Sequence, residues 1–128
     1  MIERLAVDSN AVIEWLRAGG TEPFAFRDAR WIVLPLPVVG ELYAGVFASK
    51  KRDAHLLVLE DFLTDHELLS PDGETARVYG RLRAPFQKIG QSKMNDVWIA
   101  ALCIQHDLPL LTNDRGFDSF PELRVIHW

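Results

Sequence analysis

Cysteine is nearly absent from the sequence, since its 128 residues include only one. A single thiol excludes an internal disulfide framework and a zinc site built on cysteines, and it suits a reducing compartment. No apolar run approaches the roughly 20 residues that span a bilayer. The early charged residues Glu3, Arg4 and Asp8 leave no apolar region of a signal peptide. These absences predict a cytoplasmic protein that does not cross a membrane.

Repeats, low-complexity tracts and long Pro/Gly-rich linkers are also absent, so a single domain over residues 1–128 is expected. An excess of positive charge is missing too, because the formal net charge is -4. This charge argues mildly against a protein that binds nucleic acid through bulk electrostatic attraction. The four histidines show no metal-ligand spacing. Hydrophobic residues at 48% and charged residues at 25% are typical of a folded domain.

Short apolar runs alternate with helical patterns along the chain, which predicts an α/β fold with a parallel sheet between two helical layers. Pro85 interrupts one helical pattern and predicts a kink or break there. Strands are expected at 5–7, 31–34, 67–69, 108–112 and 124–127. Helices are expected at 10–17, 37–48, 54–63, 72–89 and from 95 or 96 to 106, with a further short one at 23–30.

Acidic residues follow two of these apolar runs directly. Asp8 comes after residues 5–7, and Asp114 comes after residues 110–112 and Asn113. Ligands of open parallel sheets bind beyond the carboxyl ends of the strands, so both carboxylates lie where a site is expected. The alternative is that each aspartate serves a turn or a helix cap, where this residue is common.

Two further acidic residues interrupt apolar helical surfaces. Glu41 lies at the edge of an apolar stripe, and Asp96 begins an otherwise apolar helix. The alternative for Glu41 is a side chain whose aliphatic part packs on the stripe and whose carboxylate is solvated. The alternative for Asp96 is an anion stabilised at a helix N-terminus. Two unit charges about 4 Å apart repel by roughly 4 kcal/mol at an effective dielectric constant of about 20. If all four carboxylates converge, they need bound cations or protons, and Mg²⁺ or Mn²⁺ suits such oxygen ligands.

The sequence resembles the PIN domain family, and within it the VapC-type toxins of bacterial toxin–antitoxin pairs. The segments that carry the resemblance are Leu5-Ala6-Val7-Asp8-Ser9-Asn10, Val38-Val39-Gly40-Glu41-Leu42-Tyr43-Ala44-Gly45, Asn95-Asp96-Val97-Trp98-Ile99-Ala100-Ala101 and Leu110-Leu111-Thr112-Asn113-Asp114-Arg115-Gly116-Phe117. The ending, Leu123 to Trp128, is similar to the closing strand of the family. The resemblance implies a three-layer α/β/α fold with strand order 3-2-1-4-5.

The resemblance also assigns roles to residues. It implies that Asp8, Glu41, Asp96 and Asp114 are catalytic, and that the three aspartates bind Mg²⁺ or Mn²⁺. Glu41 would bridge a second ion or orient the attacking water. Ser9, Thr112 and Asn113 would support the site. Asp118 is an additional acidic residue that would bind the ion or cap the following turn.

The implied activity is metal-dependent endoribonuclease cleavage of a structured RNA, tRNA or rRNA, which inhibits translation. A cognate VapB-type antitoxin would neutralise the protein, and a homodimer is expected. One alternative is a PIN-type nuclease that processes RNA without an antitoxin. Another is a PIN-like module that binds RNA without cleaving it.

Two surfaces are expected to bind these partners. The stretch from residue 77 to residue 93 is basic without an acidic residue, and phosphates would bind to Arg77, Arg81, Lys88 and Lys93. The alternative is a solvated helix face that binds no partner. Three of these, Arg77, Arg81 and Lys88, share a helical face if the helix persists past Pro85. Large apolar residues are candidates for an antitoxin groove, namely Trp15, Leu16, Phe24, Phe26, Val46 and Phe47.

Overall fold

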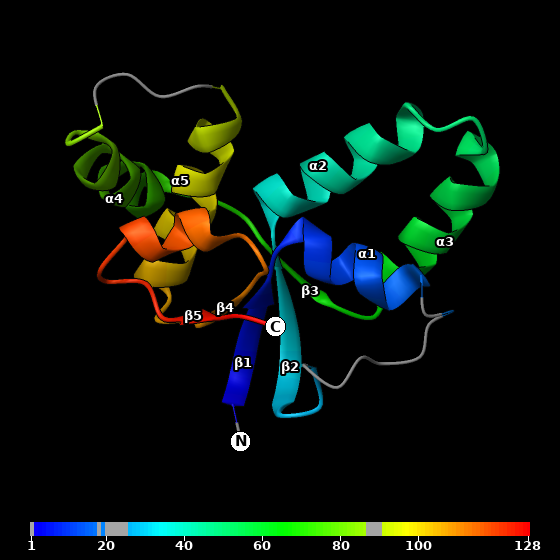
Figure 1. Cartoon of the computed structure of the whole chain (residues 1–128), viewed down its shortest axis with the longest axis horizontal. Helices are drawn as coiled ribbons and strands as arrows, with labels where there is room; N and C mark the ends of the chain where they lie inside the picture. The colour runs from blue at the N-terminus through cyan, green and yellow to red at the C-terminus, as the bar shows by residue number, and fades with distance from the viewer. Residues whose placement is uncertain (1, 18, 20–25, 87–90) are drawn as a thin grey trace.

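A computed structural model of the chain describes residues 2–17, 19, 26–86 and 91–128, with the backbone alone at 91 and 92. Within these ranges, five parallel strands form one sheet of order β3-β2-β1-β4-β5 (Figure 1). The predicted α/β fold and strand order are therefore confirmed. The strands are β1 (Ile2–Val7), β2 (Ala29–Pro35), β3 (Glu67–Leu69), β4 (Leu110–Leu111) and β5 (Val125–Ile126).

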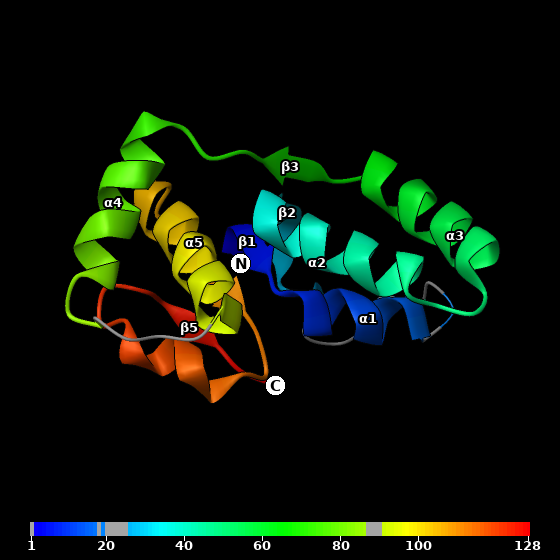
Figure 2. The ribbon, with the colours of Figure 1, turned by 90° about the horizontal axis from the view of Figure 1, so that it is seen from above.

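Helices cover both faces of the sheet, as the view from above shows (Figure 2). One face carries α1 (Ser9–Arg17), α2 (Leu36–Phe47) and α3 (Arg52–Thr64). The other carries α4 (Gly73–Arg83) and α5 (Gln91–Gln105), and the short 3₁₀ helix η2 (Arg115–Ser119) follows β4. The chain runs from β1 through β2 to β3 and then crosses to β4 on the other side of β1. Right-handed crossovers in these two opposite directions place helices on opposite faces of the sheet. No helix in the described part of the chain is long and apolar enough to cross a membrane.

The centre of the sheet is buried on both faces, which explains its uninterrupted apolar runs. Leu5, Ala6 and Val7 of β1 are at most 1% exposed, and Leu110 and Leu111 of β4 are fully buried. Helix α5 is apolar on most sides for the same reason, because residues 99–103 are fully buried. The strand ends that precede Asp8 and Asp114 are thus fixed in the core.

Helix α4 begins as its sequence indicates and ends earlier than expected. Asp72 caps it: the Thr75 amide donates to Asp72 Oδ1 at 3.1 Å, and the Asp72 amide donates to Thr75 Oγ1 at 2.9 Å. The break predicted at Pro85 is confirmed, because α4 ends at Arg83, and the helix expected to residue 89 does not continue through Phe86. Ala84 still has helical angles, with φ -53° and ψ -40°, but Pro85 has no N–H to donate to the carbonyl four residues earlier.

Other boundaries also differ from the expectation. Helix α5 begins at Gln91, so Asp96 lies inside the helix and does not open it. The interpretation of Asp96 as an anion at the helix N-terminus is therefore wrong. The short helix expected at 23–30 falls partly outside the described residues, and its last part is wrong because β2 begins at Ala29. The terminal strands are shorter than expected, since β4 and β5 have two residues each.

Candidate active site

The carboxyl ends of β1 and β4 lie side by side at the centre of the sheet. Ala6 pairs with Leu110, and Val7 pairs with Leu111. The pairing continues one step beyond the strands, because the Asp8 amide donates to the Leu111 carbonyl at 3.0 Å. Asp8 is only 6% exposed. The edge of the sheet where ligands of parallel sheets bind thus carries a buried carboxylate.

Both oxygens of Asp8 accept hydrogen bonds. The Ser9 amide donates to Oδ1 at 2.8 Å. Oδ2 accepts from the Thr112 hydroxyl at 2.8 Å and from Asn10 Nδ2 at 3.3 Å. Burial raises the pKa of Asp8, with a smaller contribution from the charge of Asp114, while these hydrogen bonds lower it. Asp8 is therefore held in one orientation by three neighbours.

Asp114 is attached to the same corner through Thr112. The Asp114 amide donates to the Thr112 hydroxyl oxygen at 3.0 Å, and Asp114 Oδ1 accepts from the Gly116 amide at 2.8 Å. The second contact caps the N-terminus of η2. Because the cap uses Oδ1, Oδ2 of this carboxylate has no hydrogen-bond partner among the described residues, so Asp114 can serve both the turn and a ligand.

Glu41 reaches the site from α2. The Ser9 hydroxyl donates to Glu41 Oε2 at 3.0 Å. Burial raises the pKa of Glu41, the charge of Asp8 adds to this, and hydrogen bonds from Ser9 and Asn95 oppose it. Asn95 precedes Asp96 on α5, so this contact connects α2 with α5. The half-exposed glutamate expected from its place on the apolar stripe is therefore part of a polar network.

Asp96 shows the strongest effect of its acidic neighbours. Its side chain is 19% exposed. Burial and then the charges of Asp114 and Asp8 raise its pKa to about 6, against the opposing charge of Lys93. The Lys93 ammonium lies 3.8 Å from Asp96 Oδ2. The four carboxylates predicted from the sequence are thus brought within electrostatic range of one another.

A divalent cation would relieve this repulsion. Among the described residues, no three His, Cys, Asp or Glu side chains are close enough together to hold one ion by direct contacts. Mg²⁺ commonly keeps several waters and binds through one or two carboxylates, so this spacing is compatible with water-bridged contacts. The oxygen-only donor set fits Mg²⁺ or Mn²⁺ better than zinc.

Not every predicted site residue joins the network. Ser9 and Thr112 do, whereas the Asn113 side chain is exposed and has no hydrogen bond recorded to a described residue. Asp118 Oδ1 accepts from His127 Nε2 at 2.9 Å, and His127 Nδ1 lies 2.9 Å from the Thr112 carbonyl oxygen. His127, one of the four histidines whose spacing predicted no metal site, therefore fixes the position of the β4 end together with Asp118.

Two asparagines of the site were missed by the sequence analysis. Asn10 binds Asp8 and Thr112 through Nδ2, while its buried Oδ1 has no protein partner among the described residues. Asn95 binds Glu41. Both lie inside the motifs that contain Asp8 and Asp96. Their positions beside aspartates in those motifs were the available signal.

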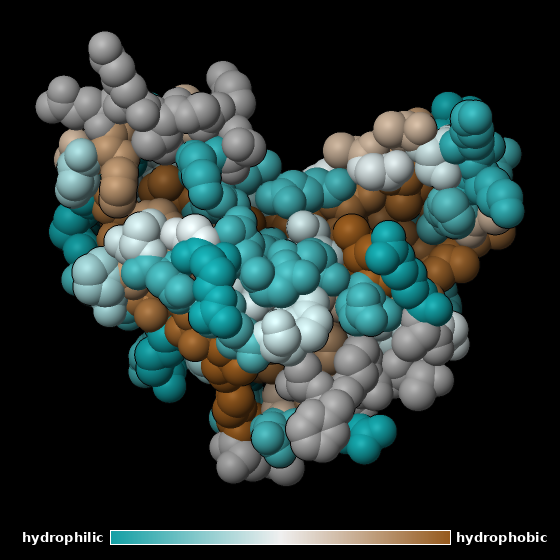
Figure 3. All heavy atoms as spheres, in the orientation of Figure 1, coloured by the Kyte–Doolittle hydropathy of each residue, from teal (hydrophilic) through white to brown (hydrophobic). Residues whose placement is uncertain are grey.

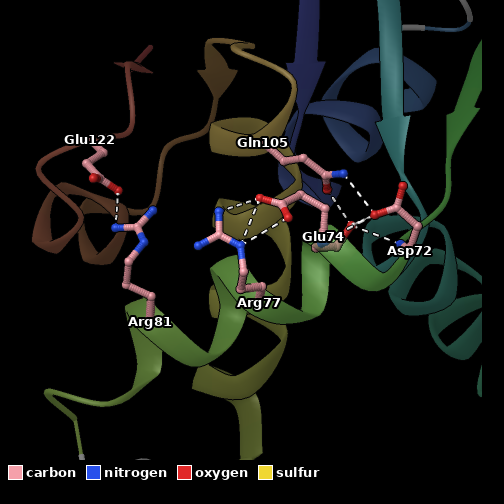
Figure 4. Close-up of polar contacts among 7 residues, drawn as sticks. Asp72, Glu74, Arg77, Arg81, Gln105 and Glu122 are labelled. Carbon is pink, nitrogen blue, oxygen red and sulfur yellow. Dashed lines mark hydrogen bonds and ion pairs between the residues drawn. The ribbon is translucent and has the colours of Figure 1, made fainter.

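The predicted basic residues lie in different surroundings. Arg77 pairs with Glu74, with 3.0 Å between Nε and Oε2, and Arg81 Nη1 pairs with Glu122 Oε2 at 2.8 Å (Figure 4). Lys88 lies outside the described residues, and α4 ends before it, so the shared helical face is not formed within the described chain. Lys93 adjoins Asp96 and is thus the basic residue next to the carboxylates.

The surface beside the carboxylates is hollowed. Figure 3 shows a notch between α5 and the α2–α3 side, with hydrophilic residues at its floor and apolar residues over α1, α2 and α3. A groove of about 680 Å³ runs between these three helices from Ser9 and Glu41. Its apolar lining is Ile13, Leu16, Leu42, Val46, Val58 and Leu59.

A family model described as the PIN domain matches residues 5–123. The chain belongs to the PIN domain family. This PIN domain is 35% identical to Ribonuclease VapC5 of Mycobacterium tuberculosis over 82 residues, which is 62% of this chain and 61% of that protein. It is 33% identical to Ribonuclease VapC2 of Haemophilus influenzae over 92 residues, or 70% of each chain. The aligned part thus spans less than two thirds of the first of these relatives.

Solved structures share its fold. A VapBC2 structure from Rickettsia felis, bound to a promoter DNA fragment, superimposes with a TM-score of 0.81 at 24% identity and covers 98% of both chains. The VapBC-5 toxin–antitoxin structure from Mycobacterium tuberculosis gives a TM-score of 0.72 at 27% identity, again over 98% of both chains. The resemblance to VapC-type PIN domains is confirmed.

Proposed function

We propose that this PIN domain is a metal-dependent endoribonuclease, the toxin of a VapBC-type pair. The observation that carries the proposal is the mutual electrostatic effect of Asp8, Glu41, Asp96 and Asp114 at the carboxyl edge of the sheet. The relatives named ribonuclease VapC support the activity. Structures of related toxins with antitoxins support the pairing.

The three aspartates would hold Mg²⁺ or Mn²⁺. The bound ion supplies a more acidic water and a polarised phosphoryl oxygen. Glu41, oriented by Ser9 and Asn95, is placed to accept a proton from the attacking water, and its raised pKa makes it a better base. The hydrogen bonds of Asp8 to Ser9, Asn10 and Thr112 keep that carboxylate fixed while charge develops on the phosphate.

The substrate is a structured RNA, tRNA or rRNA, whose cleavage would inhibit translation. Lys93 is the residue best placed to bind a phosphate beside the carboxylates. Arg77 and Arg81 are exposed, and each is paired with a glutamate. Phosphate would have to displace those partners, so their contribution to binding is expected to be smaller.

The groove between α1, α2 and α3 is the proposed site of a VapB-type antitoxin. Leu16 and Val46, two of the six residues expected there, line it. Phe26 does not, since it is 1% exposed and packs against Trp15 in the core, and Phe24 lies outside the described residues. An apolar segment of the antitoxin would cover the groove and end beside Glu41. A homodimer is also proposed, on the resemblance alone.

Cleavage of a total RNA pool tests the proposal. The purified protein is incubated with the RNA and Mn²⁺, and new 5′ ends are mapped with and without a chelator. Discrete new ends that require the metal and disappear in Asp96→Asn support a metal-dependent endoribonuclease. RNA binding without cleavage would instead identify a binding module. Cleavage by a protein that no antitoxin inhibits would favour a nuclease of RNA processing.

A further inference from the structure

A second hollow lies against the carboxylates on the α5 and η2 side. It measures about 170 Å³, and Asp96 and Lys93 belong to its lining. Phe86, Val97 and Phe120 form its apolar walls. Apolar cavities of about 150 Å³ admit a benzene-sized ring, so this hollow has room for one ring of similar size. It therefore shares Asp96 with the candidate active site and otherwise has a different lining.

The aromatic walls are held in different ways. Phe120 is 6% exposed, and its amide donates to the Phe117 carbonyl at 3.2 Å. Phe86 is 37% exposed and lies edge-on to Phe120, with 6.1 Å between ring centroids and 70° between planes. One wall is thus fixed in the core, and the other is an aromatic ring that is partly exposed to solvent. A partly exposed aromatic ring can serve as a platform on which nucleobases of any sequence stack.

Lys93 stands where this hollow meets the carboxylates. Its ammonium lies 3.8 Å from Asp96 Oδ2. A Cβ atom at Gly116 would come within 2.7 Å of Lys93 Nζ, so the absence of a side chain at this position leaves room for the ammonium. A cation at the boundary suits the phosphate that joins a bound base to the nucleotide being cleaved.

We propose that this hollow binds one unstacked nucleobase of the RNA, next to the scissile phosphate. The inference rests on the proposed ribonuclease function and adds a subsite to it. Phe86 stacks on the base, Phe120 and Val97 enclose its edge, and Lys93 binds the adjoining phosphate. The Ser119 hydroxyl donates to the Gly116 carbonyl at 2.8 Å, and its oxygen can accept a hydrogen bond from the base edge. Single-stranded RNA at the cleavage position is the class of substrate that can present such a base.

The test uses short RNAs around a mapped cleavage position, each with one abasic nucleotide at a different place. At one place near the cut, the loss of the base should lower kcat/KM by about tenfold, chiefly through KM. Phe86→Ala should produce a similar loss on intact RNA and almost none on that abasic RNA, because both changes remove the same contact. Phe86→Tyr should retain the activity of the parent.

Trp31→Ala is the matched control, since Trp31 is 56% exposed on β2 and absent from this lining. It should cleave every RNA as the parent does. Binding of the same RNAs in a chelator, followed by fluorescence anisotropy, makes the comparison independent of cleavage. The inference is overturned if all abasic RNAs bind and react like intact RNA. It is also overturned if Phe86→Ala weakens the binding of intact RNA and of the abasic RNA equally. It is also overturned if that variant weakens antitoxin binding alone. Cleavage by the parent would leave the ribonuclease proposal standing in each case.

Discussion

The Thr112 hydroxyl donates a hydrogen bond of 2.8 Å to Asp8 Oδ2 across a sequence separation of 104 residues. The same hydroxyl oxygen accepts from the Asp114 amide at 3.0 Å. Thr112 is fully buried, so neither partner can exchange it freely for water. One hydroxyl therefore sets the relative positions of two site carboxylates that follow different strands.

Replacing Thr112 tests this link. Thr112→Val keeps the shape but leaves the Asp114 amide and one Asp8 oxygen without this partner, so the free energy of unfolding should fall by about 1–3 kcal/mol. Cleavage should fall as well, because Asp8 loses its orientation. Thr112→Ser keeps the hydroxyl and should preserve most of the cleavage rate. Urea unfolding and the cleavage rate measure the two effects, and equal activity of the Val and Ser variants would contradict the positioning role.

The pH dependence of stability should reveal the repulsion at Asp96. A pKa raised from 3.8 to about 6 means that the folded state holds this proton more tightly than the unfolded state. The stabilising effect is present below the unfolded pKa and is lost as the pH rises through about 6. It amounts to roughly 3 kcal/mol, since one pKa unit corresponds to about 1.4 kcal/mol.

The measurement for Asp96 is the free energy of unfolding of the metal-free protein at several pH values. The stability of Asp96→Asn relative to the parent should increase as the pH rises from about 4 to 7. A constant difference over this range would show that the proton at Asp96 is not linked to folding.

A divalent ion should stabilise the folded protein through the same carboxylates. A ligand of the folded state adds about 2.7 kcal/mol at a hundredfold excess over its Kd. Mn²⁺ should therefore raise the Tm of the parent more than that of Asp8→Asn or Asp114→Asn, and these variants should fold but not cleave. Thermal scans with Mn²⁺ and with an equal ionic strength of Na⁺ distinguish specific binding from screening. Equal shifts in parent and variants would contradict the metal site.

The antitoxin groove offers a matched pair of adjacent residues. Val58 lines the groove and is 52% exposed, whereas its neighbour Leu57 does not line it and is 73% exposed. Val58→Asp should weaken binding of the cognate antitoxin by roughly tenfold or more, because a covered charge without a partner is costly. Leu57→Asp should bind like the parent. Calorimetry with the antitoxin measures both, and a similar effect of the two substitutions would place the antitoxin elsewhere.

The sheet and its acidic edge could be predicted because their signals are local. The apolar run at 5–7 ends at Asp8, and that at 110–112 is soon followed by Asp114. The burial of both strands on two faces produces such runs directly. The strand order and the membership of Glu41 and Asp96 came from the family motifs, since helical periodicity alone left ordinary surface roles open for both.

The remaining contacts depend on distances that the chain pattern does not encode. Glu122 neutralises Arg81 from 41 residues away, which the sequence pattern does not show, whereas Glu74 lies three residues before Arg77 and was a local signal that the prediction overlooked. The start of α5 was missed because Asn95 and Asp96 resemble cap residues, whereas both lie inside the helix facing other carboxylates. The site places Asn95 and Asp96 inside a helix, although both residue types prefer helix caps. A prediction from the sequence relies on such local preferences and therefore misplaced the start of the helix.

The position of β1 between β2 and β4 also determines when the acidic site can form during protein synthesis. Asp8 is made first, but its donor Thr112 and its neighbour Asp114 come from the last part of the described chain. A nascent chain that lacks residues 110–114 has no β4, and so it cannot assemble the centre. A ribosome that has not yet made residues 110–114 therefore carries the early helices without the assembled acidic site, which leaves time for a partner to reach those helices first.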